Sequence, residues 1–87
     1  MDKNLKNKME EKIQETISNK NEIKQLLQSL SNIDDSQSFV LGIIIGRIYN
    51  SFYYQSKRIL NREPTKEEFH EFVEFITSKK TNFENLW

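Results

Sequence analysis

The sequence predicts an all-α fold, a small bundle of three to four helices with an antiparallel helical hairpin at its C-terminal end. Residues that interrupt regular structure are scarce, since glycine and proline occur only at Gly42, Gly46 and Pro64. Apolar residues recur at intervals of three and four, which is the spacing of one helix face. The 87 residues suffice for one helical domain, residues 1–87. A chain of this length buries only about 60% of its unfolded surface, so a partner often adds stability.

The first helical segment is expected from about Lys3 to Leu30. Its first half has an apolar residue at every fourth position, namely Leu5, Met9, Ile13 and Ile17. Its second half keeps helical spacing on a rotated face, with Ile23, Leu26, Leu27 and Leu30. Between the halves, Asn19 precedes Glu22 by three residues, as an N-cap precedes its capping-box partner. We therefore expect a break or kink near Asn19, with one continuous helix as the alternative.

The central helix is expected from about Gln37 to Asn61. A preceding polar residue is expected to cap it, and the candidates are Asp34, Asp35 and Ser36. Because proline disfavours the helical conformation of the residue before it, Glu63 and Pro64 end this helix.

The last helix is expected from about Lys66 to Lys80. Thr65 and Glu68 have the spacing of a capping box, in which each side chain accepts a hydrogen bond from the other residue's backbone N–H. Residues 62–68, Arg-Glu-Pro-Thr-Lys-Glu-Glu, resemble the Arg-x-Pro-Thr-x-Glu-Glu stretch of bacterial sigma factors, where it opens a helix. The resemblance covers this segment alone and implies a helix start, without a function. The tail ends in Phe83, Leu86 and Trp87, and we expect it to dock on the bundle.

The core is expected where the central and last helices face each other. The apolar residues that share these faces are Leu41, Ile45, Ile48, Phe52, Phe69, Phe72, Val73 and Ile76.

The first half of the central helix is apolar on every side, and such a helix must be surrounded. Gly42 and Gly46 lie one turn apart in this stretch and would let another backbone approach closely. Each glycine costs about 1 kcal/mol relative to alanine in a helix interior, which indicates that close packing is needed there. Either the glycines pack against the first helix of the same chain, or Phe39, Gly42, Ile43 and Gly46 form a partner-binding or self-association surface.

The second half of the central helix is basic. Residues 36–62 contain four cations and no acid, whereas residues 63–87 contain three lysines and six glutamates. One stripe contains Arg47, Tyr54, Arg58 and Asn61, with Ser51 and Arg62 beside it. The candidate nucleic-acid-binding residues, which we call the basic stripe, are Arg47, Tyr54, Lys57, Arg58 and Arg62. Three interpretations remain open. The cations pair with Glu67, Glu68, Glu71 and Glu74 on the last helix; or they contact nucleic-acid phosphates while Tyr49, Tyr53 and Tyr54 stack on bases; or they are simply solvated.

The sequence has no pattern typical of an enzyme or a metal site. It contains no cysteine, which excludes disulfides, thiolate zinc sites and a cysteine nucleophile and suits a reducing cytoplasm. The single histidine, His70, lies among glutamates and is interpreted as solvated surface. We expect no cofactor, no small-molecule substrate and no membrane association, because the apolar run at residues 39–46 is far shorter than the roughly 20 residues that span a bilayer.

These observations predict a cytoplasmic, non-catalytic protein-interaction module, either a homodimer or a small subunit of a larger assembly. The alternative is a small nucleic-acid-binding or regulatory protein that uses the basic stripe. Net charge is zero, so a nucleic-acid partner would have to be attracted by this local patch.

Overall fold

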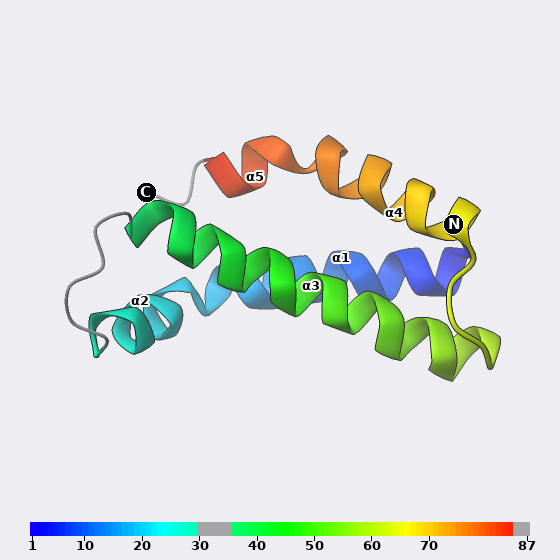
Figure 1. The fold of residues 1–87 in the computed structure, drawn as a ribbon, viewed down its shortest axis with the longest axis horizontal. Coiled ribbons are helices and arrows are strands. Elements are labelled where there is room, and N and C mark those ends of the chain that lie inside the picture. Colours follow the sequence, from blue (N-terminus) through cyan, green and yellow to red (C-terminus); the bar gives the residue numbers. More distant parts are fainter. Residues whose placement is uncertain (30–35, 85–87) are drawn as a thin grey trace.

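The computed structural model describes residues 1–29 and 36–84, which form five helices and no strand (Figure 1). α1 spans Lys3–Ser18 and α2 spans Lys20–Gln28. The long α3 spans Ser36–Leu60 and is followed by α4 at Lys66–Ser78 and by the short α5 at Lys80–Glu84. The predicted all-α fold is confirmed, and the short α5 is added to the helices that the spacing of apolar residues predicts.

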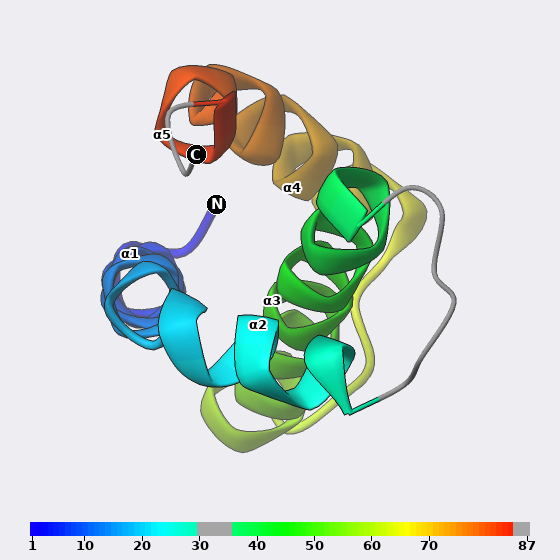
Figure 2. The ribbon, with the colours of Figure 1, turned by 90° about the vertical axis from the view of Figure 1, so that its left-hand side faces the viewer.

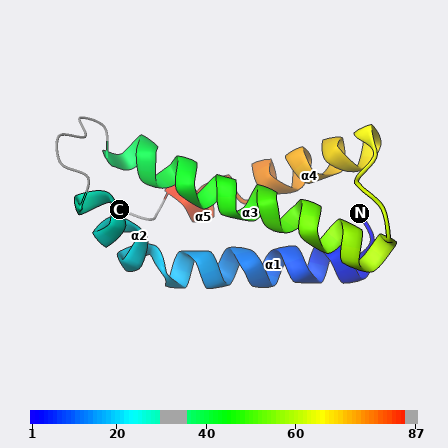
Figure 3. The same ribbon diagram turned by 60° about the horizontal axis from the view of Figure 1, so that its bottom comes forward.

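Three of the helices run back and forth along the long axis of the molecule. α1 and α3 lie side by side and antiparallel, and α4 returns antiparallel to α3 (Figures 1 and 3). Seen end-on, α1, α3 and α4 occupy the corners of a triangle, while α2 crosses between α1 and α3 (Figure 2). The bundle is elongated, with extents of 41 × 23 × 21 Å. Within residues 1–29 and 36–84, no helix has both the length and the hydropathy needed to cross a membrane.

The core lies along the axis of this triangle. α3 contributes a single stripe at every fourth position, Val40, Ile44, Ile48 and Phe52, with each residue at most 1% exposed. The other buried apolar side chains come from the surrounding helices and are Leu5, Met9, Ile13, Ile23, Leu27, Phe72, Phe75 and Phe83. Burial of Phe83 agrees with the expected docking of the tail, whereas Leu86 and Trp87 lie outside the described residues.

Aromatic rings bridge α3 and α4. The ring of Phe52 stacks on that of Phe72 with a centroid distance of 4.3 Å and an interplanar angle of 10°. Tyr49 adds a second contact to Phe72, at 6.2 Å between centroids. Such pairs contribute about 0.5–1.5 kcal/mol beyond the burial of their area. These rings therefore hold α4 against α3.

The predicted core is partly wrong. Ile48, Phe52 and Phe72 are buried as expected, and Ile45 and Ile76 are half-buried. By contrast, three residues of the predicted core are exposed: Leu41 at 41%, Phe69 at 39% and Val73 at 44%. α3 is apolar on every side in its first half, so its own pattern does not select a buried face. α1 and α2 select it by packing on the side of Val40 and Ile44.

The helix ends follow local rules with two corrections. The capping box forms: the Glu68 N–H donates to the Thr65 hydroxyl at 3.1 Å, and the Thr65 N–H donates to the Glu68 carboxylate at 2.9 Å. The expected break at Asn19 is present, but the Asn19 side chain makes no cap hydrogen bond in the described structure. α4 ends at Ser78 rather than at Lys80, because the chain kinks at Lys79 before α5 begins.

Two further features frame the ends of α3. Asn61 adopts a left-handed conformation, with φ 59°, and terminates the helix as asparagine commonly does at this position. The candidate N-caps Asp34 and Asp35 lie outside the described residues, as does the side chain of Ser36.

Candidate interaction surface

The side of α3 that faces away from the core is the most conspicuous free surface of the described structure. We call it the outer face of α3 and define it by six residues: Phe39, Gly42, Ile43, Gly46, Tyr49 and Tyr53. Ile43 and Tyr53 lie at its edges and are half-buried against the core, and Tyr49 also contacts Phe72 of α4. Five of the six are spaced by three, four, three and four residues, with Ile43 at the edge. This spacing is that of a seam along which a second helix packs. Successive residues turn by about 100° on a helix, so the outer face lies opposite the buried stripe through Ile44.

The two glycines leave a flat, unoccupied centre on this face. A Cβ atom placed on Gly42 or on Gly46 would meet no atom within 4 Å. Of the two alternatives for these glycines, packing against the first helix of the same chain is therefore wrong. α1 lies on another side of α3, where Glu15 reaches Arg47. The close approach that the glycines permit is not used within the described chain.

Large apolar side chains flank the glycines at both ends. On the N-terminal side, Phe39 is 52% exposed although it sits in the most apolar stretch of the sequence. On the C-terminal side, Tyr49 is exposed and makes edge-to-face contacts with Tyr53 at 5.3 Å and with Phe69 at 6.1 Å between centroids. These contacts hold Tyr49 in place before any partner binds, which reduces the conformational entropy lost on binding.

The two tyrosines also interact electrostatically. A side-chain hydrogen bond with Tyr49 raises the pKa of Tyr53 above the usual value of 10.0, and the nearby negative charge of Glu63 adds to this effect. The Tyr53 hydroxyl therefore stays protonated and uncharged near neutral pH. The sequence had suggested these tyrosines only as aromatic partners for nucleic-acid bases. The spacing of Tyr49 and Tyr53 from Gly42 and Gly46, in steps of three and four residues, is the sequence signal that places both tyrosines on the outer face of α3.

Most of the basic stripe is matched by acids. Arg47 approaches Glu15 of α1 at 3.7 Å, and Lys57 approaches Glu63 at 3.7 Å. Among the residues that the structure describes, Arg58 has no ion pair. The stripe thus presents little uncompensated positive charge.

Arg62 is the residue of the stripe that pairs with α4 as anticipated. Its guanidinium donates two hydrogen bonds to the carboxylate of Glu68, at 2.5 and 3.1 Å. This fork, together with the Thr65 N–H, lowers the pKa of Glu68 from 4.5 to about 2. Glu71, another expected partner, instead pairs with the amino group of Met1.

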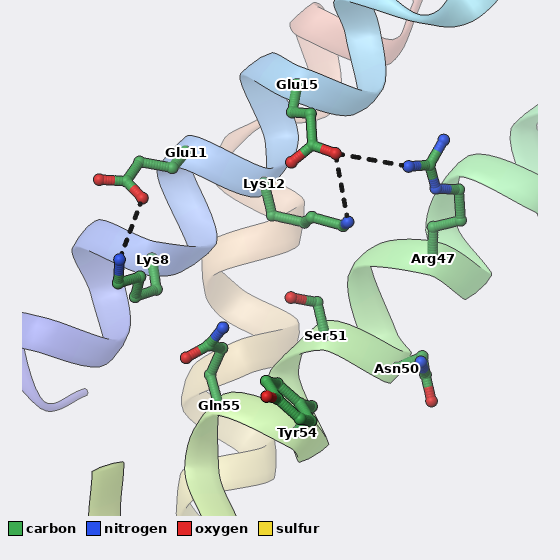
Figure 4. A pocket seen from close by; sticks show the side chains of 9 residues that line it. All are labelled: Lys8, Glu11, Lys12, Glu15, Arg47, Asn50, Ser51, Tyr54 and Gln55. Carbon is green, nitrogen blue, oxygen red and sulfur yellow. Dashed lines mark ion pairs between the residues drawn. The ribbon is translucent and has the colours of Figure 1, made fainter. Parts of the chain in front are cut away.

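A shallow groove lies between α1 and α3 next to the basic stripe (Figure 4). Figure 4 shows α1 supplying alternating lysines and glutamates, with Lys8 paired to Glu11 and Lys12 to Glu15, and α3 supplying Arg47 and polar side chains. Tyr54 lies at this groove and is 62% exposed. Because the two signs of charge alternate along the groove, it has no strong field for an anionic or a cationic ligand.

The described residues hold no group of three or more histidine, cysteine or carboxylate side chains close enough to bind a metal ion. His70 is exposed and lines a shallow depression with Tyr49, Tyr53 and Phe69. Comparison with protein-family models, with curated proteins and with solved structures finds no match for this chain.

Proposed function

We propose that this protein is a non-catalytic, cytoplasmic protein-interaction module, acting as a homodimer or as a small subunit of a larger assembly. Its binding site is the outer face of α3, and its partner is an α-helix with an apolar face. The observation that carries this proposal is the pair of glycines with nothing within 4 Å of either Cβ position. Gly42 and Gly46 lower the stability of α3 in isolation, so close approach by a partner is the physical reason for their presence.

The exposed surface of the chain is large for its mass. The chain exposes 6099 Å², whereas a compact monomer of 10.5 kDa exposes about 5400 Å². The excess of roughly 700 Å² is a property of the whole chain and agrees with the elongated shape of the bundle. The radius of gyration, 14.0 Å, likewise exceeds the about 12 Å of a compact chain of this length.

The chemistry of the surface specifies an apolar partner. None of the six residues of the outer face is charged, and three of them are aromatic. Protein-interaction sites are depleted of charge at their centre and enriched in tyrosine and phenylalanine. A flat glycine centre between aromatic ends fits the cylinder of a helix, because helices approach most closely where small residues face them.

Gly46→Leu tests the proposal because it separates folding from binding. The new side chain meets no atom within 4 Å of its Cβ, and leucine favours a helix by about 0.8 kcal/mol over glycine. We expect urea unfolding of the dilute variant to show a stability equal to or above that of the wild type. Far-ultraviolet circular dichroism should be unchanged. Binding at the outer face should be lost, because leucine fills the space that the partner backbone needs.

Binding is measured in the native cells with a photo-crosslinking amino acid at Asn50, an exposed position beside the outer face. We expect a discrete covalent adduct that disappears when Gly46→Leu is added. The matched control is Gln14→Leu on the exposed side of α1, which should leave the adduct intact. No adduct, or an adduct that Gly46→Leu leaves unchanged, would contradict the proposed function.

A further inference from the structure

We infer that the helix bound by the outer face of α3 is α3 of a second copy, in antiparallel orientation. The inference rests on the interaction function proposed above and names the partner of that surface. It follows from the symmetry of the outer face, from the position of Lys57 and from the absence of acids along α3.

Four of the six residues of the outer face are placed symmetrically about position 44. Gly42 and Gly46 lie two residues on either side of it, and Phe39 and Tyr49 lie five residues on either side. A twofold axis at this level places Gly42 beside Gly46 of the second copy and Phe39 beside Tyr49 of the second copy. Interfaces between identical chains related by a twofold axis need a patch that complements itself in this way.

The glycine contacts and the aromatic contacts of this arrangement each satisfy a separate physical requirement. The glycines let the two backbones approach at the crossing point, where any larger side chain would keep them apart. At each end of the contact, exposed Phe39 gains an aromatic partner in Tyr49 of the second copy, and both are removed from water. The same two contacts occur twice, because the axis repeats them.

The charges of α3 distinguish antiparallel from parallel pairing. Lys57 lies 18 residues after Phe39, which is five full turns, so it shares the side of Phe39. A parallel pair would place Lys57 next to Lys57 of the second copy, with Arg58 close by. Residues 36–60 contain no acid, and the exposed ion pair of Lys57 with Glu63 offsets this repulsion only in part. An antiparallel pair separates the two lysines to opposite ends of the dimer, about 39 Å apart along the axis at 1.5 Å per residue. It also opposes the two helix dipoles.

The orientation is measurable because the chain has no cysteine of its own. Lys57→Cys carries a nitroxide spin label at an exposed site outside the glycine and aromatic contacts. Pulsed electron–electron double resonance on the purified protein should give a distance of about 40 Å between the two spin labels of an antiparallel dimer. A distance under about 20 Å would show a parallel dimer and overturn the inferred orientation.

A mixing experiment gives a second readout. Phe39→Cys and Tyr49→Cys proteins of different mass, mixed and joined by a short thiol crosslinker, should yield the mixed dimer in several-fold excess over either homodimer. Preferential homodimers would overturn the antiparallel arrangement.

Sedimentation velocity of the unlabelled protein over a wide concentration range decides whether a second copy binds at all. We expect a dimer that Gly46→Leu converts to a monomer. A monomer at the highest concentrations would overturn the inference, and the Asn50 crosslinking in cells would then show separately whether another protein occupies the outer face.

Discussion

Glu68 joins the start of α4 to the turn after α3 through a single side chain. Its carboxylate accepts hydrogen bonds from the Thr65 N–H and from two nitrogens of Arg62, so it caps α4 and ties the turn after α3 to the cap. A capping interaction contributes about 1 kcal/mol, and an exposed ion pair adds up to about 1 kcal/mol. This one residue therefore fixes where the chain turns back along α3.

Glu68→Gln should lower the free energy of unfolding at pH 7 by roughly 1 kcal/mol and should change its pH dependence. The folded-state pKa of Glu68, about 2, is below the usual 4.5. The stabilisation by its charge is therefore complete above about pH 4.5 and is lost as the pH falls towards 2. Urea titrations from pH 7 to pH 2 should show the difference between wild type and variant shrinking in that window.

The matched control for this measurement is Glu67→Gln, one residue away in the same helical turn. Glu67 is exposed and has no ion pair among the described residues. Its substitution should alter the stability by less than about 0.5 kcal/mol. If both variants lose the same stability with the same pH dependence, the fork between Arg62 and Glu68 contributes nothing specific.

At the scale of elements, α4 depends on its aromatic contacts with α3. Phe72→Ala should lower the free energy of unfolding by about 3 kcal/mol, because it removes a ring that is 4% exposed and stacked on Phe52. Phe69→Ala should cost less than about 1 kcal/mol, since the Phe69 side chain is partly in water. Guanidinium unfolding followed by circular dichroism measures both.

Phe72→Leu provides a milder version in case the alanine variant does not fold, and its loss should lie between the other two. Equal losses for Phe72→Ala and Phe69→Ala would mean that α4 is rotated so that both rings are buried, as the spacing in the sequence had suggested.

At the scale of the whole molecule, the charges favour the protein-interaction proposal over the nucleic-acid alternative. Net charge is zero, and Arg47, Lys57 and Arg62 each have an acid within 4.0 Å. Binding to phosphates would have to displace these pairs. We expect fluorescence anisotropy with labelled duplex and single-stranded oligonucleotides to show no saturable binding at physiological salt. Saturable binding that weakens steeply with salt and is reduced by Arg58→Ala would favour the nucleic-acid alternative.

The local structure of this protein was readable from its sequence. The break at Asn19, the capping box at Thr65 and Glu68 and the helical character of α1 to α4 follow from residues within four positions of one another. Helix starts, stops and periodicity depend on such short-range interactions. The sequence also predicted a partner surface at Phe39, Gly42, Ile43 and Gly46, since an entirely apolar stretch with paired glycines is unusual in a short chain; that these residues bind a partner stays a prediction.

The packing of the helices against one another determines which side of each helix faces the core and which side faces solvent. The side of α3 that faces the core depends on where α1 and α2 pack, and these lie far away in the sequence. For the same reason, Arg47 pairs with Glu15 of α1 and not with an acid of α4. Gly42 and Gly46 likewise face away from α1 and not towards it. A helix that is apolar all round carries no local preference for one buried face. That choice depends on contacts between distant segments, and with it the tertiary structure placed the candidate binding surface.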